Sequence, residues 1–180
     1  MTTDIPEAIT TPDDVETSIG TLRFFDGVPT GDTVDALYDY VDRARAVHAY
    51  VVGLPLVAMR ALYVGGKAAG SDAANQFLIA DKMLDSMPLV LTANTSTLYT
   101  WGFLDLERDG PTVIDLPPGM LGVLNDAAFR YVADLGVAGQ DRGEGGKYLV
   151  LPPGFEGDVP DGYFTVQSHT NTVWMFMRGF

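Results

Sequence analysis

The sequence contains no cysteine and only two histidines, His48 and His169. The lack of cysteine excludes disulfide bonds, thiolate zinc sites, iron–sulfur ligation and a cysteine nucleophile. Two histidines are too few for a zinc centre built on several imidazoles, and Asp134, Asp141 and Glu144 lack the spacing of an EF-hand loop. We therefore expect no metal and no cofactor.

Basic residues are also scarce. The chain carries 11 Lys and Arg against 24 Asp and Glu, which gives a net charge of −13. Such a charge repels the phosphates of nucleic acids and the surface of an anionic membrane. Neither a nucleic acid nor a membrane is therefore an expected partner.

Long hydrophobic runs are missing from the sequence as well. Residues 1–14 are polar and acidic, without the basic and apolar segments of a signal peptide, and no later run reaches 18 uninterrupted apolar residues. We expect a soluble, cytoplasmic protein. Its 180 residues suit one domain, predicted over residues 15–180 after a flexible leader at 1–14.

The N-terminal half has mostly helical patterning. Residues 18–29 suit one short strand and a turn at Asp26-Gly27, and apolar residues then recur at helical spacing over 32–52. Gly53 and Pro55 predict a break and a second helix that ends near Val64, so we expect a helix pair over about 32–64. A short apolar run at 76–83 predicts a further, weak helix.

The C-terminal half has strand-like patterning and many turn residues. We therefore predict an α+β protein, mainly an antiparallel β-sandwich or partly open barrel, with the helix pair covering one end. The strands are expected at 89–92, 98–106, 112–116, 120–125, 129–135, 148–151, 163–168 and 172–178.

A glycine-rich segment, residues 136–147, is the clearest predicted loop of the chain. Its composition is compatible with a phosphate cradle, but Lys147 is followed by Tyr148 and by a strand instead of Ser or Thr and a helix. A flexible hairpin loop is the preferred interpretation because glycine permits positive φ.

Few residues are candidates for catalysis. His48 lies on the apolar side of the predicted helix, where a packing role is favoured, whereas His169 lies between two strands, as a general base or as a plain turn residue. Ser96 and His169 could form a triad with Asp105 or Asp126, but no serine has the Gly-x-Ser-x-Gly elbow.

An aromatic row is expected within the strand at 98–106. Tyr99, Trp101 and Phe103 alternate with smaller side chains and should project from the same sheet face. That face is either core, which is favoured, or the lining of an apolar pocket. The apolar segment at 174–177 has the same two interpretations.

Several ordered motifs resemble one family, the domain of unknown function 1254 family, from about residue 15 to the end of the chain. The motifs are Asn94-x-Ser-Thr-x-Tyr99, Leu104-Asp-Leu106, Gly145-Gly-Lys-Tyr-Leu149, Pro153-Gly154, and Thr170-Asn-Thr-Val-Trp174 with Arg178.

The resemblance implies a β-rich domain with N-terminal helices, which in longer members is followed by a second β domain. The apolar residues 174–180 predict a partner at the C-terminal strand, either a second β domain or another copy of the chain. A small-molecule ligand is a further expected partner.

The family motifs also supply the candidate binding residues. These are Asn94, Tyr99, Asn171 and Arg178, to which Arg130 is added as an anion partner, with turn capping as the alternative role. At Ser96 the chain departs from the aspartate that is common in the family.

Two functional hypotheses follow from the sequence. The first is a noncatalytic module that binds a small molecule or a partner. The second is a hydrolase-like enzyme that uses Ser96, Tyr99, His169 and Asn171, which requires Ser96 and His169 within about 10 Å of each other.

Overall fold

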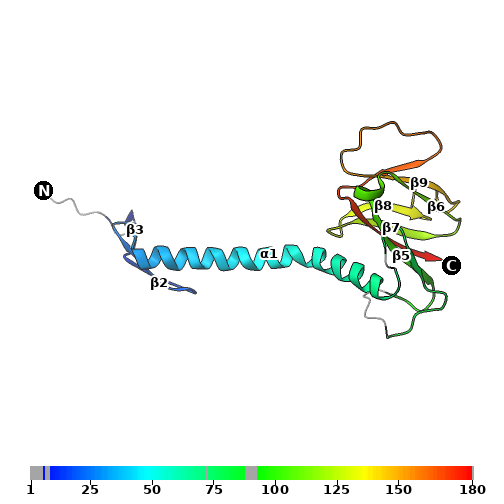
Figure 1. Ribbon diagram of the computed structural model, residues 1–180. Coiled ribbons are helices and arrows are strands. Elements are labelled where there is room, and N and C mark those ends of the chain that lie inside the picture. Colours follow the sequence, from blue (N-terminus) through cyan, green and yellow to red (C-terminus); the bar gives the residue numbers. More distant parts are fainter. Residues whose placement is uncertain (1–5, 7–8, 72, 88–92, 180) are drawn as a thin grey trace. The chain divides into compact units, whose positions relative to one another are not determined.

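The computed structural model describes residues 6, 9–71, 73–87 and 93–179. The chain divides into two compact units, an N-terminal unit, Met1–Leu54, and a β unit, Pro55–Phe180 (Figure 1). The predicted leader at 1–14 and single domain at 15–180 stay predictions.

The N-terminal unit begins with three short antiparallel strands, β1 (Asp14–Thr17), β2 (Gly20–Phe25) and β3 (Val28–Pro29). The expected turn at Asp26-Gly27 joins β2 to β3, with φ of 48° and 79° at its two residues. Such positive angles suit the tight turns of β-hairpins. One strand was predicted here, and the structure adds two.

The predicted helix pair is wrong, because one helix, α1 (Gly31–Ala68), contains Pro55 in its interior. A proline removes one helical hydrogen bond and crowds the preceding turn. The turns after Pro55 are held by packing, since Met59, Leu62 and Tyr63 contact Phe103 and Trp174. This packing stabilises the helix beyond the proline.

Side chains of the N-terminal unit are mostly exposed. Among its described residues, only Leu22 and Thr33 are buried. His48 is exposed, so the packing role expected for it is wrong. Large apolar side chains are exposed along its part of α1: Tyr38, Tyr40, Val47, Tyr50, Val51 and Val52.

By length and composition alone, α1 is able to cross a membrane. Its most apolar 18-residue window has a mean hydropathy of 1.5, and 6% of that window is buried. Soluble core helices and signal sequences meet the same criteria. The expected absence of a membrane partner therefore stays a prediction.

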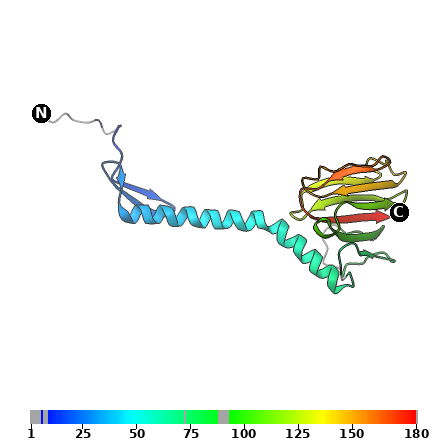
Figure 2. The same cartoon turned by 45° about the horizontal axis from the view of Figure 1, so that its top comes forward.

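The β unit contains two sheets, in agreement with the predicted α+β class (Figure 2). The larger sheet has the order β4-β5-β11-β7-β8, and the smaller has the order β10-β9-β6. The larger sheet is formed by β4 (Phe77–Ile79), β5 (Leu98–Asp105), β11 (Thr172–Gly179), β7 (Leu121–Asp126) and β8 (Tyr131–Gly136). The smaller is formed by β10 (Phe164–Gln167), β9 (Gly146–Leu151) and β6 (Thr112–Leu116).

Neighbouring strands of the β unit are antiparallel, except β9 and β10, which are parallel. A short helix, α2 (Leu106–Asp109), follows β5. The C-terminal strand β11 is hydrogen-bonded to β5 on one side and to β7 on the other. Neither of its edges is therefore open for pairing with a partner strand.

Two predicted elements, one helix and one strand, precede β5 in the sequence. The weak helix at 76–83 is wrong, because Phe77–Ile79 form the edge strand β4. Gly102 on β5 leaves room for Phe77, since a Cβ atom there would lie 2.3 Å from the Phe77 ring. The predicted strand at 89–92 lies outside the described residues.

The main core lies between the two sheets. Alternate residues of the larger sheet point toward the smaller sheet, and those near the centre of the sheet are almost fully buried. The cluster comprises Leu104, Leu124, Leu135, Val173, Met175 and Met177 from the larger sheet, Leu106 from α2, and Ile114, Leu116, Tyr148, Val150 and Val166 from the smaller sheet. This arrangement is the predicted β-sandwich interior.

The glycine-rich segment is organised around one carboxylate. Asp141, 4% exposed, accepts hydrogen bonds from the amides of Gly136 and Gly145 and from the Tyr148 hydroxyl. Burial and this contact raise the pKa of Tyr148. The segment joins β8 to β9 in different sheets, so it is not the hairpin loop that was expected.

Candidate functional site

The face of the larger sheet that points away from the core is aromatic. Register places Tyr99 opposite Arg178, Trp101 opposite Phe176 and Phe103 opposite Trp174, so these side chains share one face, here called the outer face. The predicted aromatic row is thereby confirmed. Three ring pairs continue it across β11: Tyr99–Phe176 at 5.1 Å, Phe176–Trp174 at 5.1 Å and Trp174–Phe129 at 5.7 Å.

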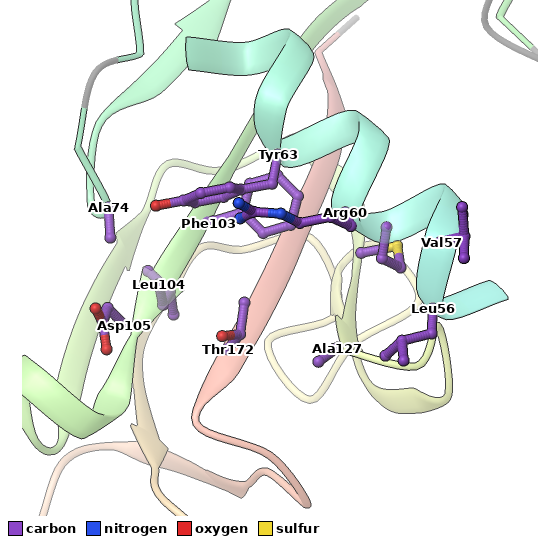
Figure 3. A pocket seen from close by; sticks show the side chains of 11 residues that line it. Leu56, Val57, Arg60, Tyr63, Ala74, Phe103, Leu104, Asp105, Ala127 and Thr172 are labelled. Carbon is purple, nitrogen blue, oxygen red and sulfur yellow. The ribbon is translucent and has the colours of Figure 1, made fainter. Parts of the chain in front are cut away.

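A cavity of about 550 Å³ lies at one end of the outer face, between α1 and β5, and is here called the apolar pocket (Figure 3). Most of its lining is apolar, and both interpretations of the aromatic row therefore hold in part. The lining residues are Leu56, Val57, Met59, Arg60, Tyr63, Ala74, Phe103, Leu104, Asp105, Ala127 and Thr172.

The spacing of residues along α1 determines which of its side chains line the pocket. Leu56, Met59 or Arg60, and Tyr63 are three or four residues apart, so they project from neighbouring turns of the helix. Met59 is 3% exposed, and the Tyr63 ring meets the Phe103 ring edge to face at 5.1 Å. These contacts fix the wall of the pocket before any ligand arrives.

Two charged groups line the apolar pocket at separate places (Figure 3). The Arg60 guanidinium stands 5.3 Å from the centre of the Tyr63 ring, and within the described residues it has no ion pair or hydrogen bond. The Asp105 carboxylate accepts a hydrogen bond of 3.1 Å from the Arg108 amide and thereby caps α2. Arg60 is thus available to bind an acidic group.

Three predicted site residues lie together at the start of β5, Asn94 and Ser96 in the turn before it and Tyr99 within the strand. The Asn94 side-chain oxygen accepts hydrogen bonds from the backbone amide and the hydroxyl of both Ser96 and Thr97, at 2.9–3.1 Å. The Asn94 amide donates to the Tyr99 hydroxyl at 2.8 Å. These bonds give Asn94 and Ser96 a capping role in the turn.

Arg130 is engaged by a buried carboxylate. Its Nε atom donates to Asp126 Oδ2 at 2.6 Å, and Asp126 also accepts from the amides of Ala128 and Arg130. Burial of Asp126 opposes ionisation, but these hydrogen bonds outweigh it and lower the pKa of the carboxyl group. Arg130 therefore secures the β7–β8 turn through its Nε atom, and the anion-partner role predicted for it stays a prediction.

The other two predicted residues lie beyond the opposite end of β5. His169 is exposed in the turn before β11, and the Asn171 carbonyl accepts a hydrogen bond of 2.8 Å from the Leu106 amide. Register pairs Leu98 with Gly179 and Asp105 with Thr172.

Ser96 and His169 thus lie past opposite ends of an eight-residue ladder. At a rise of about 3.3 Å per residue, the ladder is roughly 23 Å long. A nucleophile and its base must meet within hydrogen-bonding distance. Ser96 and His169 therefore cannot act as a catalytic pair in this structure.

Tyr99 and Arg178 line a second depression on the outer face, of about 330 Å³. The structure thus brings Asn94, Tyr99 and Arg178 to one end of β5 and leaves Asn171 and His169 at the other.

The residues of the apolar pocket that the sequence did not indicate as a site are mainly Arg60 and Tyr63, whereas Asp105 was considered only as the acid of a triad. Their only signal was the spacing of Leu56, Met59 and Tyr63, which does not say what the helix packs against.

No group of three or more metal-ligating side chains was found within the described residues. The model of one family, described as a protein of unknown function (DUF1254), matches residues 74–180. The chain belongs to this family. The DUF1254 match includes every strand of the β unit, from β4 to β11, and so covers both sheets of the sandwich.

A solved structure also resembles this DUF1254 chain. The crystal structure of the VPA0106 protein from Vibrio parahaemolyticus has a TM-score of 0.54 and 21% sequence identity, and the match covers 72% of this chain and 31% of that one. At this identity the likeness shows the fold alone. No curated protein matches the chain.

Proposed function

We propose that the β unit is a noncatalytic module that binds a small, mainly apolar molecule in the apolar pocket. The observation that supports this most directly is the wall formed by Met59, Tyr63 and Phe103, which is held in place by its own packing. A volume of about 550 Å³ falls in the range of known ligand sites, roughly 300–1,000 Å³, and such sites are usually preformed and apolar.

The polar lining suggests the character of the ligand. Arg60 is exposed and unpaired within the described residues, so an acidic group on an otherwise apolar ligand would find a donor there. Asp105 already serves α2 as its cap and contributes a second polar group. We propose a flat or branched apolar body with one acidic group.

The test is titration of the full chain with naphthalene-2-carboxylate, followed by calorimetry and ligand-observed NMR. Ala127→Phe places a ring in the pocket, and Ala138→Phe makes the same change in an exposed loop position. We expect binding to the wild type, a loss of about tenfold or more in Ala127→Phe because the ring occupies the ligand's space, and no change in Ala138→Phe. Equal affinities in both variants would overturn the proposal.

The Arg60→Gln variant tests recognition of the ligand's acidic group separately from binding of its apolar body. We expect it to weaken naphthalene-2-carboxylate and to leave the neutral naphthalene-2-carboxamide unchanged, because only the former carries a charge for the guanidinium. Equal weakening of both probes would remove the acid-binding role and leave the apolar pocket.

The predicted partner, a second β domain or another copy of the chain, stays a separate prediction. The cytoplasmic location stays a prediction as well. The hydrolase alternative depends on contact between Ser96 and His169, which lie past opposite ends of β5.

A further inference from the structure

Arg178 has an unusual position for an unpaired cation. It lies half-buried on the outer face, opposite Tyr99 on β5 and opposite Leu121 on β7. Within the described residues its guanidinium has no ion pair, hydrogen bond or aromatic ring partner. Partial burial removes water from a group with five N–H donors, so an acceptor at this position is favourable.

An unpaired carboxylate lines the same depression. Asp134 on β8 accepts one hydrogen bond of 3.2 Å from the Tyr131 hydroxyl. A carboxylate has about four acceptor positions, and no cation lies within ion-pair distance of Asp134 in the described part of the chain. The depression therefore offers one free donor group and one free acceptor group.

Strand register sets the distance between the two groups. Asp134 is opposite Val123, Arg178 is opposite Leu121, and β7 lies between β8 and β11. Strands are about 4.8 Å apart and rise about 3.3 Å per residue, so the two Cα atoms are roughly 12 Å apart. The two side chains form no ion pair in the described part of the chain, and this separation leaves room for a small molecule between them.

The floor between the charges is apolar. Leu121, Val123 and Phe176 line it, and the Phe176 ring is fixed between the rings of Tyr99 and Trp174 at 5.1 Å from each. Such a floor favours contact with methylene groups or an aromatic ring. The depression is distinct from the apolar pocket, which lies at the opposite end of the outer face.

We propose that this depression, here called the Arg178 site, binds a small zwitterion with an apolar middle. The ligand's carboxylate pairs with Arg178, its ammonium group pairs with Asp134, and its apolar middle lies on Phe176 and Val123. A molecule with only one charge satisfies one of the two protein groups and leaves the other unpaired.

Three probes of equal length test the proposal: 6-aminohexanoate, hexanoate and hexylammonium. Calorimetric titration of the full chain should give the highest affinity for 6-aminohexanoate, by roughly tenfold over each singly charged probe. Hexanoate lacks the ammonium group that pairs with Asp134, and hexylammonium lacks the carboxylate that pairs with Arg178, so each loses one charge-assisted hydrogen bond. Equal affinities, or binding of none of the three, would overturn the proposal.

Two variants assign the two ends of the ligand. Arg178→Gln should lower the affinity for 6-aminohexanoate to that of hexylammonium, and Asp134→Asn should lower it to that of hexanoate. Arg142→Gln removes a different exposed guanidinium and should change nothing. Loss of the same size in all three variants would indicate a general charge effect and contradict the site.

A direct ion pair between Arg178 and Asp134 in solution is the competing account. It predicts coupled losses of stability in the two single variants and their double variant, together with no preference for the zwitterion. Thermal unfolding of the four proteins, the wild type, the two single variants and the double variant, measures this coupling and confirms that each variant folds.

If Arg178→Gln fails to fold, Arg178→Lys is the alternative variant. It keeps the charge, loses the planar guanidinium and should retain only part of the preference for the zwitterion. The Ala127→Phe variant should bind 6-aminohexanoate normally, which separates this site from the apolar pocket.

Discussion

The two faces of the larger sheet differ in chemistry although they come from the same strands. The inner face is aliphatic and closed: Leu124, Leu135 and Val173 are each 0% exposed. The outer face is aromatic and partly open, with Trp101 and Phe176 half-buried and a depression at each end. The alternation of side chains along a strand thus separates the aliphatic residues of the sandwich core from the aromatic residues of the outer face.

This difference leads to opposite expectations for substitutions one residue apart. A change on the inner face should alter the free energy of unfolding and leave ligand affinity intact in the folded protein. A change on the outer face near either depression should alter affinity more than stability.

The largest effect is expected on the inner face. Leu124→Ala should lower the free energy of unfolding by about 2–5 kcal/mol, because it leaves a cavity in a close-packed core. Val113→Ala, on a β6 residue that is 45% exposed, is the control and should cost far less. Urea unfolding measures both, and equal losses would contradict the assignment of the core.

A smaller effect is expected from the buried carboxylate at the β7–β8 turn. The folded-state pKa of Asp126 is lowered, so its contribution to stability is present above the unfolded pKa, near 4, and is lost as the pH falls through the folded value. Stability of the wild type should therefore fall on acidification more steeply than that of Asp126→Asn. Thermal unfolding between pH 7 and pH 2 checks this, and parallel curves would contradict it.

A still smaller effect is expected at the turn before β5. Asn94→Ala removes four hydrogen bonds to Ser96 and Thr97 and should lower the free energy of unfolding by about 1 kcal/mol, as for other lost caps. Ser96→Ala keeps the backbone bond and should cost only a few tenths of that. If Ser96→Ala were the more harmful change, a role for Ser96 beyond the turn would be indicated.

Much of the sandwich was predictable because strand patterning is local. The strand at 112–116 has the predicted bounds, and those at 98–106 and 172–178 differ by one residue at one end. The helix pair was not predictable correctly, since Pro55 signals a break and its tolerance depends on packing far along the chain.

The candidate site was less predictable for the same reason. Asp126 lies four residues before Arg130, but the sequence does not show that the Asp126 carboxylate is buried and pairs with Arg130 Nε. Tyr99 and Arg178 are nearly 80 residues apart in the sequence, and the β5–β11 register is what makes them neighbours. Arg60 and Tyr63 had only a helical spacing to distinguish them.

The central claim is that the outer face of the larger sheet binds ligand and the inner face does not. The most direct measurement is a map of NMR chemical-shift changes on titration with naphthalene-2-carboxylate, using the side-chain methyl groups of methionine and leucine. Changes should be concentrated at Met59 and Leu56, which line the apolar pocket, and be small at Leu124 and Leu135 in the core. Larger changes at Leu124 and Leu135 than at Met59 and Leu56 would contradict the claim.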